Sequence, residues 1–152
     1  IEGKTASLFS AACVLGAIAS RANPVQEDIL REYGRCVGMA FQITDDILDI
    51  TGDDKRLGKT LGTDLGQNKL TLPLIYSLRK KRPAARRAFI QSLAGMDKSS
   101  RIEQLQINGS LDLARQKASD YSQMALNAIC QLKPGTAREA LENIARAVGS
   151  RS

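Results

Sequence analysis

The sequence predicts an all-α protein, a helical bundle, from three observations. Aromatic residues make up only 4% of the 152 residues and Trp is absent, so Ala, Leu and Ile must fill the core. Apolar residues at 43% and charged residues at 25% are typical of a globular protein of this length. Apolar residues also recur at helical spacing through nearly the whole chain. With no internal repeat or linker, residues 1–152 are expected to form a single helical domain.

Two long helices are expected in the first third of the chain. Residues 4–20 are rich in Ala, Leu and other small residues, which predicts a helix buried on most sides. Asn23 and Pro24 then predict the cap and the first position of a second helix. This helix should continue to about Ile50. A length of nearly 40 Å, at about 1.5 Å per residue, suits the central element of a bundle.

Shorter elements are expected in the rest of the chain. Residues 51–65 contain three glycines and six charged residues, which predicts a long and therefore functional loop. Further helices are predicted over residues 68–81, 83–94, 99–108 and 110–131, and in a last segment opened by Pro134. Pro73 should lie near the start of its helix or kink it, and Asn108-Gly109 should end another. The face expected to be buried on the last helix comprises Ala137, Leu141, Ile144, Ala145 and Val148.

The formal charge of +6 is concentrated in one segment. Residues 79–87 hold six basic residues and no acidic one, while basic and acidic residues balance in the rest of the chain. This run could be a nucleic-acid or membrane-surface patch, but the favoured interpretation is a solvated helix end and loop. No aromatic residues alternate with the basic ones and no nucleic-acid-binding motif is present, so no nucleic-acid partner is expected. The sequence also predicts no integral membrane segment.

The cysteine and histidine content limits which metal sites, disulfides and general bases the chain can contain. Cys13, Cys36 and Cys130 are widely spaced among apolar or small residues, which predicts buried, reduced thiols and a cytoplasmic location. The chain has no His, and so lacks the commonest general base and the commonest zinc ligand.

Three carboxylates occur within five residues, at Asp45, Asp46 and Asp49. Asp45 and Asp49 share one face of the predicted helix, where like charges repel by a few tenths of a kcal/mol. Acidic residues also interact unfavourably with the negative end of a helix. Oxygen ligands in this number favour Mg²⁺, which usually joins carboxylates to substrate phosphates. The alternative is a helix end that is acidic by chance. Gln42 lies one turn before Asp45 and could donate a hydrogen bond to a substrate or to an aspartate.

Three lysines suggest that such a cation would bind together with a diphosphate. Lys59 lies within the glycine-rich loop and Lys69 follows it, and two ammonium groups near an Asp–Mg²⁺ cluster would neutralise a diphosphate. Lys4-Thr5 opens the first helix, where a lysine and backbone N–H groups can face an anion. Taken singly, Lys59 and Lys69 are each better explained as a surface charge, and Lys4-Thr5 alone is a weak signal.

Together these residues resemble the trans-isoprenyl diphosphate synthases, the polyprenyl synthetase family. The matching motifs are, in order, Lys4-Thr5, Phe41-Gln42, Asp45-Asp46-Ile47-Leu48-Asp49, Gly52-Asp53, Gly58-Lys59, Gly62-Thr63-Asp64-Leu65 and Lys69-Leu70-Thr71-Leu72-Pro73-Leu74. The resemblance implies the C-terminal part of the all-α isoprenoid synthase fold. It covers essentially the whole chain but only about the second half of the family's usual length.

The resemblance also implies an activity, a prenyltransferase that condenses an allylic diphosphate with isopentenyl diphosphate. Asp45, Asp46 and Asp49 match the family's second aspartate-rich motif and would hold Mg²⁺. The implied substrate-binding residues are Lys4, Thr5, Gln42, Lys59 and Lys69, and the implied catalytic ones are Asp45, Lys59, Lys69 and Gln42. Asp64 matches a family aspartate to which the sequence assigns no role.

The family's first aspartate-rich motif has no counterpart here. We therefore expect the chain to be the C-terminal half of a larger catalytic domain, inactive alone, working as a homodimer or with an N-terminal half. The alternative is a non-catalytic subunit of a heteromeric prenyl diphosphate synthase. A terpene cyclase of the same fold is disfavoured by Gly58-Lys59 and Gly62-Thr63-Asp64. Product chain length and allylic substrate stay open.

Overall fold

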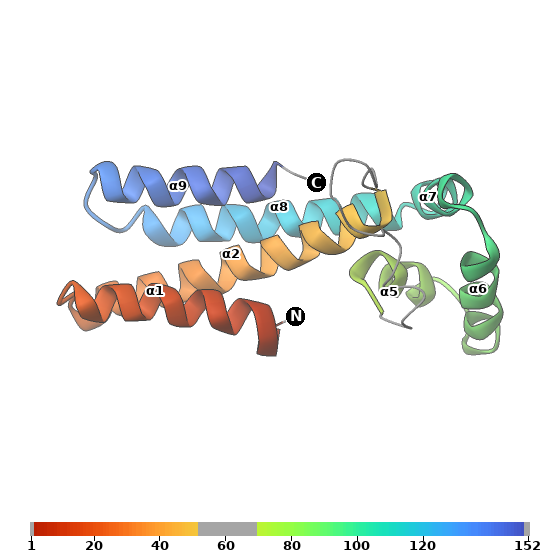
Figure 1. Ribbon diagram of the computed structural model, residues 1–152, viewed down its shortest axis with the longest axis horizontal. Coiled ribbons are helices and arrows are strands. Elements are labelled where there is room, and N and C mark those ends of the chain that lie inside the picture. The colour runs from red at the N-terminus through yellow and green to blue at the C-terminus, as the bar shows by residue number, and fades with distance from the viewer. Residues whose placement is uncertain (1, 52–69, 151–152) are drawn as a thin grey trace. The chain divides into compact units, whose positions relative to one another are not determined.

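The computed structural model describes residues 2–51 and 70–150, and the regular elements in these residues are all helical (Figure 1). They are η1 (Glu2–Ala6, a π-helical turn), α1 (Ser7–Ala19), α2 (Pro24–Thr51), α5 (Leu72–Arg79), α6 (Pro83–Gly95), α7 (Lys98–Ile107), α8 (Ser110–Ile129) and α9 (Thr136–Gly149). The all-α prediction is confirmed in this part of the chain. The predicted loop lies almost entirely outside the described residues.

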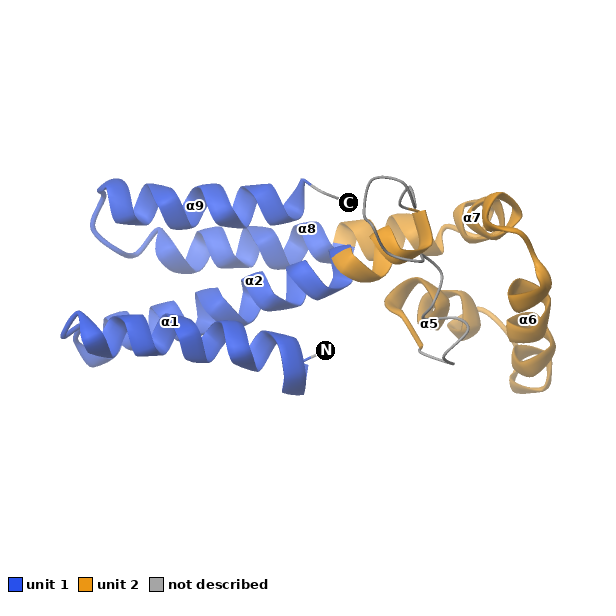
Figure 2. Ribbon diagram, viewed as in Figure 1, with its two compact units in different colours: residues 1–44, 117–152 blue, residues 45–116 orange. Residues whose placement is uncertain are grey.

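The chain forms two compact units (Figure 2). Unit 1 comprises residues 1–44 and 117–152, and unit 2 comprises residues 45–116. The helices α2 and α8 each contribute residues to both units. The assignment of residues 1–152 to a single domain, as half of a larger catalytic domain, stays a prediction.

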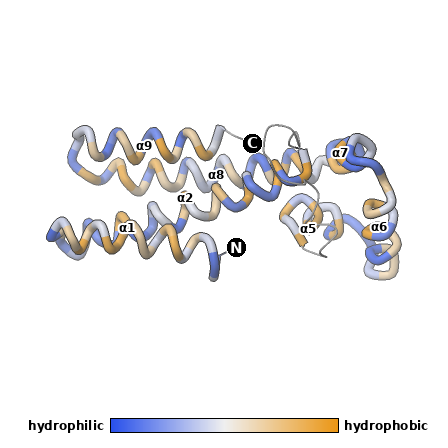
Figure 3. The backbone as a smooth tube through the Cα atoms, viewed as in Figure 1, coloured by the Kyte–Doolittle hydropathy of each residue, from blue (hydrophilic) through white to orange (hydrophobic). Residues whose placement is uncertain are grey.

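Small and branched apolar residues from α2, α8 and α9 form the core of unit 1. Apolar and polar residues alternate along these helices, as the amphipathic pattern requires (Figure 3). The buried core residues are Tyr33, Cys36, Val37, Ala40, Ala125, Ala128, Ile129, Ala145 and Val148. The core contains one aromatic residue among nine, as the low aromatic content predicts.

Three side-chain hydroxyls attach α9 to this core by donating to its backbone carbonyls. Tyr33 Oη donates to the Leu141 carbonyl at 2.9 Å, Ser122 Oγ to the Ala145 carbonyl at 2.6 Å, and Thr44 Oγ1 to the Val148 carbonyl at 3.4 Å. The acceptors lie on the same face of α9. Each of the three hydroxyls thereby has an acceptor, which avoids the free-energy cost of burying it without a hydrogen bond.

Two predictions about this last helix are wrong. The helix begins at Thr136 with Gly135 as its N-cap, two residues after Pro134. Ala137 and Ile144 are exposed, whereas Ala145 and Val148 are buried as predicted. At 100° per residue, Ala137 and Ile144 lie at one edge of the predicted face, and only the other part of that face meets the core.

Two glycines on α2 allow α1 to approach closely. A Cβ on Gly34 would lie 2.7 Å from the Phe9 carbonyl oxygen, and one on Gly38 would lie 2.6 Å from the Ala6 Cα. Both distances are shorter than real Cβ contacts, so only glycine fits at these positions. Gly34 and Gly38 are one turn apart and therefore share the face of α2 that α1 covers.

The prediction that the first helix is buried on most sides is wrong. Only Ala6 in η1 and Ala17 in α1 are buried among residues 2–19, and Leu8, Leu15 and Ile18 are 70%, 66% and 54% exposed. The contact with the glycine face of α2 covers one narrow side. No other described part of the chain covers the rest. Even so, no helix among the described residues is long and apolar enough to cross a membrane.

Unit 2 contains α5, α6 and α7, and polar contacts hold the α7–α8 turn. Pro73 lies in the first turn of α5, so it starts this helix and does not kink it. Ser77 Oγ on α5 donates to Ser110 Oγ at 2.8 Å, and Asn108 Nδ2 donates to Ser77 Oγ at 3.0 Å. Gly109 has φ of +70°, the left-handed conformation that ends α7 as predicted.

The cysteine prediction is only partly correct. All three are free thiols, but Cys36 is buried, Cys13 is half-buried and Cys130 is exposed. Cys130 follows the last residue of α8, where the chain leaves the core, and its thiol donates to the Asn127 carbonyl. Apolar neighbours in the sequence do not bury a residue that lies past the end of its helix.

Alkaline pH should destabilise the protein through Tyr33, whose side chain is 2% exposed. Burial, with a smaller contribution from Cys13, raises the pKa of the Tyr33 phenol from 10.0 to about 12. The folded state therefore keeps this proton over a range in which the unfolded chain loses it. The resulting stabilisation is complete below pH 10 and is lost as the pH rises to about 12, with a magnitude of about 3 kcal/mol.

Urea unfolding of wild type and Tyr33→Phe at about pH 8 and about pH 11 checks this expectation. The variant should be less stable by about 1 kcal/mol at the lower pH, because it lacks the hydrogen bond to Leu141. By about pH 11 the wild type should have lost roughly 1.4 kcal/mol through Tyr33 while the variant loses none, so the difference should vanish or change sign. A difference that stays constant would contradict it.

Candidate functional site

The three predicted aspartates lie on the last turns of α2 and differ in exposure. Asp45 is exposed, Asp49 is half-buried and Asp46 is 8% exposed. The helix continues past all three, to Thr51, so their predicted helical arrangement is confirmed. The last turn of α2 carries no basic residue. Three negative charges therefore sit at the negative end of a helix dipole, an arrangement that a bound cation would stabilise.

The donor set fits an open metal site. Within the described residues, no three metal-binding side chains of the His, Cys, Asp or Glu type lie close enough together to hold an ion by themselves. Mg²⁺ is commonly held by one or two carboxylates, with waters and substrate phosphates completing its coordination. An exposed Asp45 beside a half-buried Asp49 matches that requirement, whereas it would not suit a closed structural site.

A hydrogen bond joins two of the predicted site residues across 37 positions of sequence. Thr5 Oγ1 donates to Gln42 Oε1 at 2.7 Å, and both side chains are partly buried. This bond fixes the direction of Oε1 and therefore the direction of Nε2, which is the donor group of the Gln42 amide. Gln42 follows Gly34 and Gly38 at four-residue spacing on α2. The close approach that these glycines allow brings Thr5 within reach.

Lys4 lies in η1 with its side chain exposed, next to Thr5. Its backbone carbonyl accepts a hydrogen bond from Ser7 Oγ, which ties η1 to the first turn of α1. Lys59, Lys69 and Asp64 lie outside the described residues.

Thr71 is a residue that sequence reasoning did not single out. It is 5% exposed, and its Oγ1 has no hydrogen-bond partner within the part of the chain that the structure describes. It is the N-cap of α5, yet its side chain does not cap the helix. Because this buried hydroxyl lacks a partner and lies two residues after Lys69, we add Thr71 to the candidate site residues. The sequence signal that could have indicated Thr71 was its position inside the Lys69–Leu74 motif.

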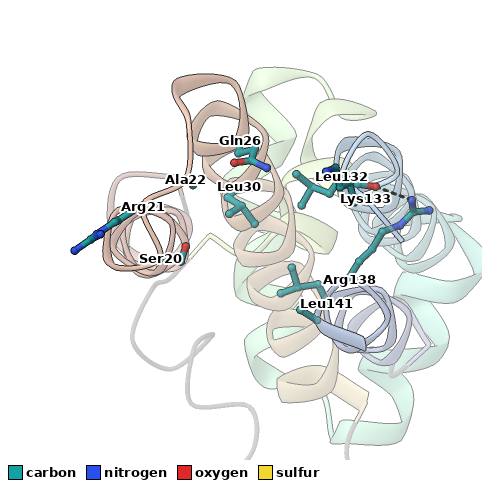
Figure 4. Close-up of a pocket in the computed structure, with 10 residues that line it drawn as sticks. Ser20, Arg21, Ala22, Gln26, Leu30, Leu132, Lys133, Arg138 and Leu141 are labelled. Carbon is teal, nitrogen blue, oxygen red and sulfur yellow. Dashed lines mark hydrogen bonds between the residues drawn. The ribbon is translucent and has the colours of Figure 1, made fainter. Parts of the chain in front are cut away.

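A depression of about 380 Å³ in unit 1 is not this site (Figure 4). It lies at the connections that join α1 to α2 and α8 to α9, and Leu30, Leu132 and Leu141 contribute its apolar lining. Arg138 also lines it, but its guanidinium already donates to the carbonyls of Cys130 and Leu132 and to Glu142. None of the predicted site residues lines this depression.

Comparison with known proteins assigns the chain to a family. The polyprenyl synthetase family model matches residues 1–109, and the chain belongs to this family. The chain is 37% identical to a short chain isoprenyl diphosphate synthase of Methanothermobacter thermautotrophicus over 95% of its own length and 46% of the relative's. It is 36% identical to heptaprenyl diphosphate synthase component 2 of Bacillus subtilis, with corresponding coverages of 99% and 44%.

A solved structure shows the same fold. A polyprenyl synthase from Caulobacter crescentus, in complex with calcium and isoprenyl diphosphate, superposes with a TM-score of 0.86 at 33% identity. The match covers 100% of this chain and 48% of that one. The chain therefore spans less than half the length of these relatives. The predicted fold, a part of the all-α isoprenoid synthase architecture, is confirmed.

Proposed function

We propose that this chain is part of a prenyltransferase that condenses an allylic diphosphate with isopentenyl diphosphate. The observation that carries the proposal is the group of three carboxylates at the C-terminal end of α2, within the segment that the family model matches. The Caulobacter crescentus relative, crystallised with a divalent cation and isoprenyl diphosphate, supports this choice of ligands.

Asp45, Asp46 and Asp49 would hold the cation, which we propose to be Mg²⁺. When bound, it would supply positive charge to stabilise the departing diphosphate. Lys4, Lys59 and Lys69 would contact the same diphosphate. The Nε2 group of Gln42, oriented by Thr5, would donate a hydrogen bond toward the substrate or an aspartate.

The reaction needs no histidine. The allylic C–O bond breaks, the double bond of isopentenyl diphosphate attacks the allylic carbon, and a proton is lost to the released diphosphate. Exclusion of water from the reacting carbons would protect the cationic carbon from hydrolysis. We propose that residues beyond this chain complete the site, in an N-terminal half or a second protomer, and that residues 1–152 alone are inactive. The proposed homodimer and cytoplasmic location are further expectations.

The experiment that tests the proposal follows labelled isopentenyl diphosphate in the full-length protein. Incorporation into a longer prenyl diphosphate, dependent on an allylic diphosphate and on Mg²⁺, is the expected result. Allylic diphosphate cleavage without incorporation would instead indicate a cyclase.

A non-catalytic subunit is the second candidate, favoured by the Bacillus subtilis relative, which is named as a component of a synthase. Purification of the natural protein distinguishes the two. A subunit would show activity only when mixed with a second, different chain, whereas the proposed enzyme would be active as purified.

Replacing Thr5 by Val should lower kcat about tenfold, because one hydrogen bond that orients Gln42 is lost while side-chain shape is kept. Thr5→Ser keeps the hydroxyl and should retain most of the activity. KM for isopentenyl diphosphate should change little in either variant. Steady-state kinetics of the full-length protein measure both constants. Equal rates for the Val and Ser variants would contradict the proposed role.

A further inference from the structure

Six basic residues at the α5–α6 corner of unit 2 form what we call the basic surface. We define it by Arg79, Lys80, Lys81, Arg82, Arg86 and Arg87. The sequence contains no Asp or Glu between residues 65 and 96, so α5 and α6 carry no carboxylate. Residues 82–88 are all exposed. Outside this surface, basic and acidic residues are equal in number, so the surface accounts for the whole net charge of +6.

Local contacts hold four of these cations without neutralising them. Lys80 Nζ donates to the Asn108 carbonyl, and Arg86 Nε donates to the carbonyls of Leu78 and Lys81. Arg79 lies 5.9 Å from the Tyr76 ring centroid, and Lys81 lies 4.0 Å from the Phe89 centroid. Carbonyls and rings orient a cation but leave its full charge. None of the six forms an ion pair with a carboxylate in the described residues.

Part of the basic surface lies at the N-terminal end of α6, which is the positive end of the helix dipole. Arg82 is the N-cap of this helix without a side-chain capping hydrogen bond, and the first turn has no acidic residue. Arg86 and Arg87 follow within the next turn. Cations near the positive end of a helix are unfavourable by themselves, and a negative partner reverses the sign of that interaction.

We propose that this basic surface binds the anionic surface of a lipid membrane from the aqueous side. Charge complementarity is the argument: an anionic bilayer presents many negative groups in one plane, and such a plane needs clustered cations but no pocket. The residues between the arginines of α6 are Pro83, Ala84 and Ala85, which are too small to insert deeply. Binding would therefore be electrostatic and reversible.

Single-stranded nucleic acid fits this surface less well. Recognition of single strands relies on aromatic faces on which the bases stack. The two aromatic rings here, Tyr76 and Phe89, are partly buried, and each already has a cation over its face. A membrane partner would also place the enzyme where an apolar prenyl chain partitions, a consequence that rests on the proposed function.

Co-sedimentation of the full-length protein with phosphatidylcholine vesicles, with and without phosphatidylglycerol, tests the proposal. Binding is expected only with the anionic lipid and should weaken at high salt. The double variant Arg82→Gln/Arg87→Gln should bind about 25-fold more weakly, at about fivefold for each cation removed. Arg82→Lys/Arg87→Lys keeps both charges and should bind like wild type.

The matched control removes two exposed cations elsewhere, Lys133→Gln/Arg146→Gln, and should weaken binding far less. Equal loss in the control would overturn the proposal, because net charge alone would then explain binding. Loss in the Lys variant, or tighter binding to a single-stranded oligonucleotide than to vesicles at the same salt, would also overturn it. Prenyl transfer with short, soluble substrates should be unchanged in Arg82→Gln/Arg87→Gln. The two proposals are therefore tested separately, and a failure of vesicle binding would not contradict the proposed prenyltransferase function.

Discussion

Replacing Asp45 and Asp49 together by Asn should lower kcat/KM of the full-length protein by about 10³-fold or more, because the charges that would hold the cation are lost. Mg²⁺-dependent binding of inorganic diphosphate should disappear in the same variant. Titration calorimetry with and without Mg²⁺ measures that binding separately from turnover. Retained Mg²⁺-dependent binding in the double variant would contradict the site assignment.

The matched control removes two carboxylates that have an ordinary structural explanation. Asp28 lies 3.6 Å from Arg31 and Asp112 lies 3.1 Å from Arg115, both at exposed positions. Such pairs contribute about 0–1 kcal/mol. Asp28→Asn/Asp112→Asn should therefore change kcat/KM little, although it removes the same amount of charge.

The single variants Asp45→Asn and Asp28→Asn should also differ in stability, in opposite directions. Asp45 is exposed near the C-terminal end of α2, so losing its charge relieves repulsion with the helix end and the metal-free protein should gain a few tenths of a kcal/mol. Asp28→Asn should lose a similar amount, because it breaks the pair with Arg31. A carboxylate whose removal stabilises the fold while lowering activity is retained for function.

Replacing Gly38 by Ala should destabilise the protein by about 1–3 kcal/mol, because the new methyl group meets the backbone of η1 and neither helix can yield locally. The Cβ would lie 2.6 Å from the Ala6 Cα and 3.1 Å from the Phe9 Cβ. Separation of α1 from α2 would also lengthen the Thr5–Gln42 hydrogen bond. Activity should therefore fall further than the fraction of unfolded protein explains.

Gly16→Ala is the control for this substitution. Gly16 is also helical, but nothing lies within 4 Å of the position a Cβ would take. Alanine has the higher helix propensity, so this variant should be more stable than wild type by about 0.5–1 kcal/mol. Chemical denaturation of all three proteins measures both effects. Similar changes at the two positions would show that the close approach at Gly38 is not the cause.

Helix positions could be predicted from sequence because the signals are local. Pro24 and Pro83 each occupy the first position of a helix, as expected for a residue whose missing N–H costs nothing there. Pro134 gives the same signal but lies outside its helix, since Gly135 intervenes. Composition could not predict the exposure of α1. An apolar run shows that a helix requires covering, but not which part of the protein covers it.

In the candidate site, too, local features could be predicted from the sequence and tertiary contacts could not. The shared helix of Asp45, Asp46 and Asp49 follows from their spacing, and the structure confirms it. Which carboxylate is buried depends on packing from other elements, so the low exposure of Asp46 could not be predicted. The contact between Thr5 and Gln42 spans 37 residues and depends on how closely two helices approach. Spacing alone carries no such information, and family resemblance linked these residues only as parts of one site.

The division between the two units falls inside α2 and inside α8, and in neither case at a turn. A chimera made by exchanging one unit between relatives would therefore join half-helices from different parents. Crossovers at residues 20–23 and 130–135 would instead leave both helices whole. Recombination between relatives should thus transmit the aspartates of α2 and the unit 1 core residues of the same helix as one inherited block.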